Sequence, residues 1–201
     1  MRIVAGQFRG RTLATPTHAP GNDLGNDELR PTSDRVRESV FNILAHGIDD
    51  FAISGARVID LFAGTGALGL EAISRGAAYC LFVEESAEAR ALIRRNVETF
   101  GLTGETRIFR RDATDLGPAN KADRYSLAFL DPPYGKGLGE KALSGLASGN
   151  WLTPGAVCVL EERAGTLVDV PAAFTLLDTR TYGDTEVRIL RFDVQSKSTA
   201  P

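Results

Sequence analysis

The sequence predicts an α/β fold with a mostly parallel sheet, and three observations lead to this prediction. From Arg57 onward, short apolar runs alternate with segments of helical periodicity, which is the pattern of a parallel sheet covered on both faces. The final stretch, residues 174–192, holds two alternating runs around a Tyr182-Gly183-Asp184 turn, which is typical of an antiparallel hairpin. The 201 residues are 43% hydrophobic, which is enough for one sizeable core.

The elements before the sheet are expected to be small. Residues 2–8 and 11–16 flank a short turn and predict a β-hairpin. Residues 18–28 are rich in Gly, Asn, Asp and Pro and therefore predict a mobile loop. In residues 35–47 the apolar side chains recur at helical spacing, so we expect a helix that leads into the sheet.

Within the sheet region, apolar runs predict strands and amphipathic segments predict helices. The predicted strands are residues 56–62, 79–84, 106–112, 125–131 and 156–162, and the predicted helices cover about residues 67–76, 86–100 and 138–149. Each of the first four strands ends in, or next to, an acidic residue, and these acids are Asp60, Glu84, Asp112 and Asp131. Four acids at neighbouring strand ends predict an electronegative crevice.

Composition excludes several classes of protein. No stretch approaches the roughly 18 to 20 apolar residues that span a bilayer, and no apolar region follows the first charges, so a cytoplasmic location is expected. Cys80 and Cys158 each lie in an apolar run, which favours buried thiols over a disulfide. His18 and His46 lie far apart without cysteine partners, so no metal site is predicted.

A glycine-rich turn follows the first predicted strand. Gly64, Gly66 and Gly69 stand between a strand and a helix, at the spacing that lets a nucleotide cofactor approach the backbone and the helix amino terminus. Glu84 follows the first glycine by about 20 residues, at the end of the next strand, where a carboxylate can accept hydrogen bonds from ribose hydroxyls. These features fit NAD and S-adenosylmethionine equally well.

The acids favour S-adenosylmethionine over NAD. Asp60 precedes the glycines, so its charge would repel a pyrophosphate but suits the ammonium and sulfonium groups of S-adenosylmethionine. Asp112 stands where a side chain can meet the adenine amino group. The alternative is that such acids cap helices or lie in loops, which is acceptable for one acid but not for four in register with a glycine loop.

The segment FLDPPYGK, residues 129–136, points to the chemistry. Proline has no N–H, so residues 132 and 133 offer carbonyl acceptors without competing donors. Proline also keeps Asp131 extended, which aims its carboxylate into the crevice. Tyr134 offers a ring on which an unpaired base can stack. This set suits an exocyclic amine of a nucleobase; the alternative is a Pro-Pro turn that caps a strand with a packed tyrosine.

Basic residues gather at the amino terminus although the net charge is −3. Residues 1–20 contain Arg2, Arg9, Arg11 and His18 and no acid. A local basic patch on an acidic protein is compatible with nucleic acid bound at one face. The alternative is a solvated arginine-bearing hairpin, which the charge alone slightly favours.

Several segments together resemble a known family. VIDLFAGTGALGLEA, FVEES, RRDATDL and FLDPPYGKG are similar to the class I adenosylmethionine-dependent amino-methyltransferases. RIVAGQFRGRTLATP and RPTSDRVRESVFNIL narrow the resemblance to the bacterial 16S ribosomal RNA guanine-N2 methyltransferases of the RsmD type, over nearly the whole chain. The resemblance implies a Rossmann-like sheet of seven strands with an antiparallel last strand. It also implies methyl transfer from S-adenosylmethionine to N2 of one guanine in 16S rRNA, within the assembled or assembling small subunit.

The residues and the resemblance together give three sets of candidates. The cofactor set is Asp60, Gly64, Gly66, Glu84, Asp112 and Ala113; the catalytic set is Asp131, Pro132 and Tyr134; the RNA set is Arg2, Arg9, Arg11, Arg35, Arg37 and Lys136. For Arg35 and Arg37, contact with the cofactor carboxylate or with water alone are equal alternatives. The acid-bearing residues 18–30 depart from the family pattern.

We expect three parts of the chain: an RNA-contacting hairpin and loop at residues 1–34, a methyltransferase domain at 35–195 and a disordered tail at 196–201. Two other functions stay open from the sequence. A DNA adenine-N6 methyltransferase uses the same chemistry but usually carries a target-recognition region, for which this chain has little room. A non-catalytic RNA-binding module would use the arginine hairpin and keep a relic cofactor pocket. A monomer is expected, because no long apolar surface stripe is visible.

Overall fold

The computed structural model of the protein describes residues 1–16, 34–120 and 122–193. The helices in these ranges are α1 (Asp34–His46), α2 (Ala67–Ser74), α3 (Ala87–Phe100) and α4 (Leu138–Ser148). The strands are β1 (Arg57–Leu61), β2 (Tyr79–Val83), β3 (Thr106–Phe109), β4 (Tyr125–Leu130), β5 (Leu152–Arg163), β6 (Phe174–Tyr182) and β7 (Thr185–Phe192).

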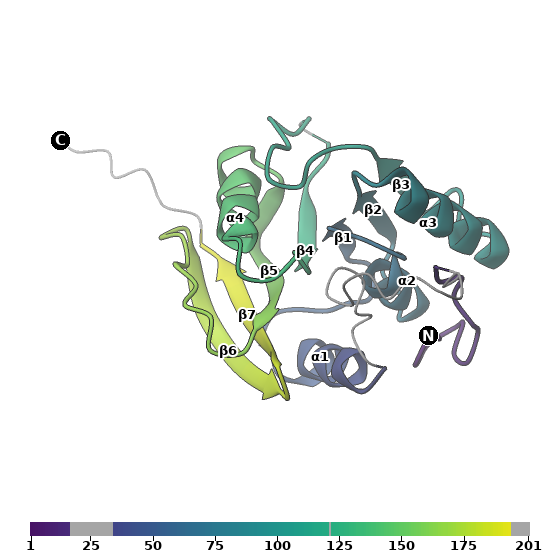
Figure 1. Ribbon diagram of the computed structural model, residues 1–201, viewed down its shortest axis with the longest axis horizontal. Helices are drawn as coiled ribbons and strands as arrows, with labels where there is room; N and C mark the ends of the chain where they lie inside the picture. Colours follow the sequence, from purple (N-terminus) through teal and green to yellow (C-terminus); the bar gives the residue numbers. More distant parts are fainter. Residues whose placement is uncertain (17–33, 121, 194–201) are drawn as a thin grey trace, which may run out of the picture.

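One sheet contains all seven of these strands, in the order β3-β2-β1-β4-β5-β7-β6 (Figure 1). The pairs from β3 to β5 are parallel, whereas β7 runs antiparallel to both β5 and β6. The predicted α/β class and the antiparallel last strand are therefore confirmed. The strand order reverses at β1, which pairs with β2 on one side and β4 on the other, and such a reversal opens a ligand crevice at the carboxyl ends of the strands.

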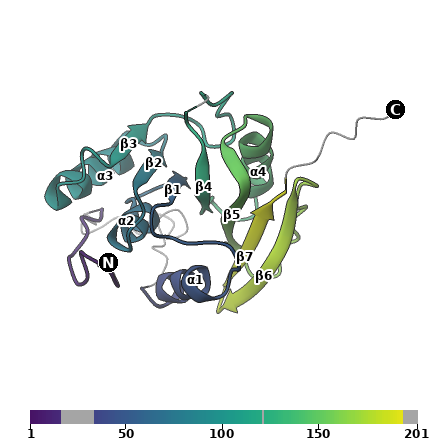
Figure 2. The ribbon, with the colours of Figure 1, turned by 180° about the vertical axis from the view of Figure 1, so that it is seen from behind.

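Apolar residues that alternate along the strands divide the core into two layers. On one face of the sheet, α1, α2 and α3 share a core cluster with strand residues such as Phe82 and Phe129. On the other face, α4 shares a cluster with Leu61 and Leu130. Figures 1 and 2 show α4 on the side of the sheet away from the other three helices. Both cysteines are free and buried, as predicted.

Two strands differ from the prediction by three or more residues at one end. β3 ends at Phe109, which pairs with Val83 at the end of β2; because β2 stops there, residues 110–112 have no strand to pair with and leave the sheet. β5 begins four residues earlier than predicted, at Leu152 opposite Tyr125, with a register shift before the next pair. The irregularity includes Gly155, whose φ is 75°, and a glycine at such a position commonly marks a bulge.

The amino-terminal hairpin is smaller than predicted. Within residues 1–16, one antiparallel bridge joins Arg2 to Thr12. The chain between them turns at Gly6 and Gly10, whose φ values are 80° and 82°, so the arms are too short for a ladder. We call residues 1–16 the N-terminal segment. It lies beside α2 and α3 in both views (Figures 1 and 2), and Ile3, Phe8 and Leu13 belong to the same core cluster as those helices.

A buried carboxylate, Glu71 of α2, fastens the N-terminal segment. Its oxygens accept hydrogen bonds from the backbone N–H groups of Val4 (2.8 Å) and Ala5 (3.0 Å) and from Arg75 Nε (2.8 Å). Arg37 Nε lies 3.6 Å from Glu71 Oε2, and both side chains are fully buried. A buried charge is stable only when hydrogen bonds and opposite charges surround it. The partners of Glu71 come from the N-terminal segment, α1 and α2, so this cluster links all three.

The prediction that Arg37 contacts RNA is wrong. Its side chain is fully buried, donates to Asp34 Oδ1 (2.8 Å) and to the backbone carbonyl of Arg2, and pairs with Glu71. In the sequence, Arg37 lies on the polar face of a predicted amphipathic helix, where an arginine is normally exposed to solvent. The N-terminal segment covers this part of α1, and periodicity within one helix carries no information about a distant segment.

No helix in the described ranges combines the length and apolar character needed to cross a membrane. The mobile loop predicted at residues 18–28 and the disordered tail predicted at residues 196–201 lie outside the described residues. The predicted domain boundaries stay predictions.

Replacing Glu71 with alanine should lower the free energy of unfolding by about 3–5 kcal/mol, because it removes the buried carboxylate that offsets the charge of Arg37. Urea unfolding followed by circular dichroism measures this loss. The matched control is Arg180→Ala, which breaks an ion pair with Asp178 whose side chains are 57% and 28% exposed; its loss should stay within about 1 kcal/mol. Equal losses in the two variants would contradict the role given to Glu71.

Candidate active site

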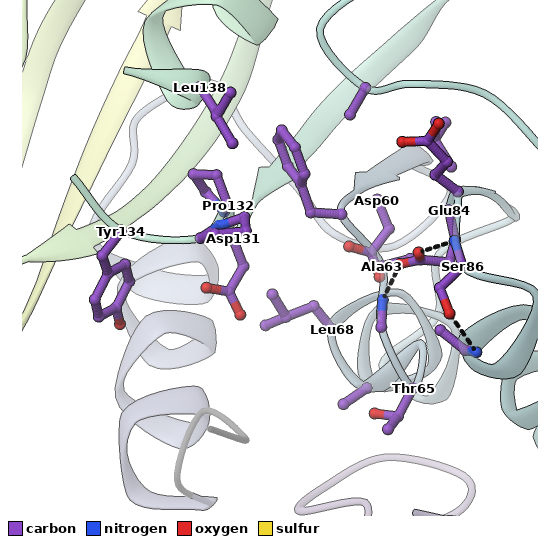
Figure 3. Close-up of a pocket in the computed structure, with 18 of the residues that line it drawn as sticks. Asp60, Ala63, Thr65, Leu68, Glu84, Ser86, Asp131, Pro132, Tyr134 and Leu138 are labelled. Atoms are coloured by element: carbon purple, nitrogen blue, oxygen red, sulfur yellow. Dashed lines mark hydrogen bonds between the residues drawn. The ribbon is translucent and has the colours of Figure 1, made fainter. Parts of the chain in front are cut away.

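A cavity of about 1600 Å³ opens at the carboxyl ends of β1, β2 and β4. Figure 3 shows Asp131 and Tyr134 on one side of it and Glu84 and Ser86 on the other, with Leu68 between them. Ligand sites for one small molecule usually measure about 300–1000 Å³. This cavity therefore has room for more than one ligand group.

The glycine loop, residues 62–66, forms the floor between β1 and α2. Gly66 caps α2 with a φ of 78°, and a Cβ atom there would approach the Phe82 ring to 3.2 Å. A Cβ at Gly69 would lie 2.4 Å from the same ring, so this glycine lets α2 pack closely on β2. Gly64 lines the cavity, whereas Gly66, the last residue of the loop, is buried and does not line it. The cofactor contact predicted for Gly66 stays a prediction.

Glu84 follows the last residue of β2 and orders the turn around it. Its carboxylate accepts hydrogen bonds from the backbone N–H groups of Gly64 (2.8 Å) and Ser86 (2.7 Å). Ser86 in turn caps α3 by accepting from the N–H of Ala89 (3.3 Å). These hydrogen bonds join the glycine loop to the start of α3. Glu84 is half-buried and lines the cavity, so part of its side chain is accessible to a ligand.

Asp60 is the most deeply buried acid of the site. It is 1% exposed and its Oδ2 accepts from the N–H of Gly69 at 3.0 Å. Burial raises its pKa from 3.8 to about 8; the Gly69 hydrogen bond opposes this shift, and the charge of Glu84 adds to it. The Asp60 side chain is therefore largely protonated at neutral pH, a state that the sequence alone did not indicate.

Asp112 and Ala113 lie in a turn after β3. Asp112 Oδ1 accepts from the backbone N–H and the hydroxyl of Thr114, both at 2.8 Å. These hydrogen bonds lower the pKa of Asp112, because they stabilise its charged form. Asp112 is exposed and Ala113 is buried, and both line the cavity.

The residues after β4 form the opposite wall. Asp131 and Tyr134 are half-buried and Pro132 is buried, and all three line the cavity. Tyr134 Oη donates to Glu161 Oε1 at 2.6 Å, and the next residue, Gly135, donates its N–H to Glu162 Oε1 at 3.0 Å. Burial, followed by the hydrogen bond to Glu161, raises the pKa of Tyr134. Two glutamates of β5 thus fix the conformation of this wall.

The basic candidates do not form one cluster at the cavity. Arg9 and Arg35 are exposed, and the Arg2 side chain is 69% exposed with Nε 3.5 Å from Asp34. Arg11 donates to the carbonyl of Thr99 (2.8 Å), and its guanidinium lies 4.5 Å from the centre of the Phe100 ring. Lys136 is exposed and lines the cavity. The RNA contacts of these residues stay predictions.

Sequence reasoning missed several lining residues. Met1, Thr15 and Pro16 bring the N-terminal segment into the cavity wall, a contact for which no local sequence signal exists. Phe62 also lines the cavity and has a φ of 58°; a bulky residue in this left-handed region is strained, and such strain gathers at functional sites. A backbone outlier of this kind is visible only in a structure.

The lining residues fit a cofactor that carries positive charge. The acids that line the cavity are Asp60, Glu84, Glu85, Glu88, Asp112, Asp131 and Asp184, whereas the basic lining residues are Arg111, Lys136 and Arg163. Even without Asp60, which is largely protonated, the acids outnumber the bases, and this excess disfavours a doubly anionic pyrophosphate and favours an ammonium or a sulfonium. Within the described part of the chain, no group of three His, Cys, Asp or Glu side chains suits a metal ion.

Comparison with known proteins identifies the family of this chain. At 36% identity, 201 residues match "Ribosomal RNA small subunit methyltransferase D" of Escherichia coli (strain K12), over 100% of this chain and 94% of that protein. The protein of the same name from Haemophilus influenzae is 33% identical over 191 residues, 94% of this chain and 92% of the relative. A solved structure of a putative methyltransferase from Escherichia coli superposes with a TM-score of 0.80 at 32% identity, covering 97% of this chain and 99% of that one. The family model described as "Conserved hypothetical protein 95" matches residues 1–191, and the chain belongs to this family.

Proposed function

We propose that this protein is an S-adenosylmethionine-dependent methyltransferase that modifies the exocyclic N2 amine of a guanine in 16S rRNA. The names of its relatives at 33–36% identity support the rRNA substrate. The choice of N2 rests on the family resemblance of the sequence. The acid-lined cavity supports a cationic methyl donor.

One observation carries the proposal. The carboxylate of Asp131 and the backbone of Pro132 stand directly after β4, in the same cavity as Glu84 after β2 (Figure 3). A nucleobase amine held on one side of this cavity therefore faces a cofactor held on the other. When bound, S-adenosylmethionine would supply a methyl group activated by a sulfonium.

Asp131 and Pro132 would orient the amine. The lone pair of an exocyclic nitrogen is delocalised into the base, so the amine is a poor nucleophile. If the Asp131 carboxylate and the Pro132 carbonyl each accept one N–H, the lone pair is turned toward the methyl group, and the positive charge that develops on nitrogen is stabilised. The new N–C bond would replace the S–C bond of the donor, with S-adenosylhomocysteine as the leaving group, and the amine would give up one proton to Asp131 or to water. The buried Pro132 has no N–H, so this backbone stretch is rigid and rich in acceptors.

Tyr134 would support the base through its ring and not through its hydroxyl. The hydroxyl donates to Glu161 and lies 3.2 Å from Thr185 Oγ1, which fixes the ring against β5 and β7. The raised pKa of Tyr134 argues against its acting as a base at neutral pH. Stacking of a base on such a ring is worth about 1–3 kcal/mol.

On the cofactor side, the proposed contacts follow the chemistry of each acid. Glu84 would accept hydrogen bonds from the ribose hydroxyls, and Asp112 with Ala113 would border the adenine. The Asp60 carboxylate would face the ammonium, and a cation bound nearby favours the ionised form of a carboxyl group. Binding of the cofactor should therefore release the proton from Asp60.

The proposal predicts transfer of tritiated methyl groups to 16S rRNA in purified small ribosomal subunits, with the label recovered as N2-methylguanine after nuclease digestion. Naked 16S rRNA and duplex DNA are assayed in parallel. Label in DNA adenine would replace the proposal with an adenine-N6 methyltransferase. Binding to subunits without any transfer would favour a non-catalytic RNA-binding module.

In the same assay, Asp131→Ala should lower kcat by about 10²–10³-fold, the usual loss when one group that stabilises transition-state charge is removed. Asp115→Ala is the control, because Asp115 is an exposed acid of the turn that follows β3 and does not line the cavity. An Asp131 variant with unchanged kcat would remove this residue from the mechanism.

The pKa of Asp60 predicts how stability depends on pH. Since the folded state holds the Asp60 proton up to about pH 8 and the unfolded state releases it near 3.8, the folded protein binds more protons between these values and loses stability as the pH rises, by at most about 1.4 kcal/mol per pH unit. Asp60→Asn removes this contribution. Relative to wild type, the variant should gain about 2–3 kcal/mol between pH 5.5 and 7.5, measured by urea unfolding. Parallel pH profiles would contradict the prediction.

Arg9→Ala should weaken binding to small subunits and flatten its salt dependence, by about 0.7–0.9 in the slope of log K against log salt for each lost phosphate contact. Binding is measured across a series of salt concentrations. Arg180→Ala, an exposed arginine of the β6–β7 hairpin, controls for the loss of one positive charge. If the Arg9 and Arg180 variants have the same slope as wild type, Arg9 is not part of the RNA contact.

A further inference from the structure

Asn96 of α3 connects two walls of the cavity that are far apart in the sequence. Its side chain is 2% exposed. The amide oxygen accepts from the N–H of Ala14 at 2.7 Å, and the amide nitrogen donates to the carbonyl of Ala14 at 3.3 Å and to that of Thr65 at 3.1 Å. Both N–H donors of the amide and its oxygen are therefore used, which fixes the orientation of the side chain.

Both segments that Asn96 holds belong to the cavity. Thr65 lies in the glycine loop and lines the cavity, as do Thr15 and Pro16, which directly follow Ala14. Met1 lines it as well, with its sulfur 3.6 Å from the Thr65 hydroxyl. The N-terminal segment lies next to α3 in both ribbon views (Figures 1 and 2). One buried amide thus sets the distance between the glycine loop and the Thr15-Pro16 wall.

We propose that Asn96 is a positioning residue for the cofactor site, and that the N-terminal segment forms one wall of that site through it. The inference rests on the proposed function, because it concerns the ligand that the glycine loop would hold. Asn96 does not line the cavity and therefore acts through its neighbours. It keeps Thr15 and Pro16 against the glycine loop, so that the cavity is already shaped when the cofactor enters, and such preorganisation raises affinity by lowering the ordering cost.

A second buried residue provides a matched control. Ser74 of α2 is 4% exposed; its hydroxyl accepts from the N–H of Phe8 (2.9 Å) and donates to the carbonyl of Ala5 (2.6 Å). Like Asn96, it holds the backbone of the N-terminal segment. Unlike Asn96, it holds residues that do not line the cavity. The two residues thus separate docking of the segment from shaping of the site.

The test compares Asn96→Ala, Ser74→Ala and wild type by calorimetric titration with S-adenosylhomocysteine, at a temperature where all three proteins are folded. We expect Asn96→Ala to weaken binding by about tenfold, the loss of roughly one well-placed hydrogen-bond contribution. Ser74→Ala should change the Kd by less than about twofold, although both variants lower the melting temperature. An unchanged Kd in Asn96→Ala, or equal weakening in both variants, would overturn the inference.

Wild-type protein gives a second test that needs no variant to fold. Hydrogen exchange is measured with and without S-adenosylhomocysteine. The ligand should slow exchange of the Ala14 amide, which donates to Asn96, more than exchange of the Phe8 amide, which donates to Ser74. No preferential slowing at Ala14 overturns the inference while leaving the proposed function intact. Wild type that does not bind S-adenosylhomocysteine overturns both.

Discussion

The register of three parallel strands is the constraint on which the site depends. β1 pairs with β2 and β4 so that Leu61 lies opposite both Val83 and Leu130. The residues that follow these three positions, including Glu84 and Asp131, therefore leave the sheet side by side at its carboxyl end. A shift of one residue in either pair would turn every side chain of that strand to the other face. The two core layers fix the register, because each strand is buried on both faces.

Much of this end of the sheet could be predicted from the sequence, because the sequence patterns that indicate it are local. An acid near the end of an apolar run, glycines at fixed spacing and a proline pair each indicate the conformation of their own segment, and Asp60, Gly64, Glu84 and Asp131 all line the cavity. What could not be predicted depends on contacts between distant segments. The burial of Arg37 depends on Glu71 and on the N-terminal segment, and helical periodicity does not report such a partner.

The protonation of Asp60 could not be predicted from the sequence for the same reason. A sequence shows an acid at the end of a strand, but the direction of its pKa shift depends on whether water or apolar side chains surround it. Here burial prevails over the hydrogen bond from Gly69, whereas for Asp112 the hydrogen bonds from Thr114 prevail over weak burial. Two acids that look equivalent in the sequence therefore carry different charges at neutral pH.

This difference explains how a cavity lined by so many acids stays compatible with folding. Three of these acids are balanced locally: Glu84 by two backbone N–H groups, Asp112 by Thr114 and Asp60, near the end of β1, by its proton. The repulsion between Asp60 and Glu84 is relieved while the proton is present. A cation that enters the cavity would replace that proton as the balancing charge, so the arrangement favours a positively charged ligand over a neutral analogue of the same shape.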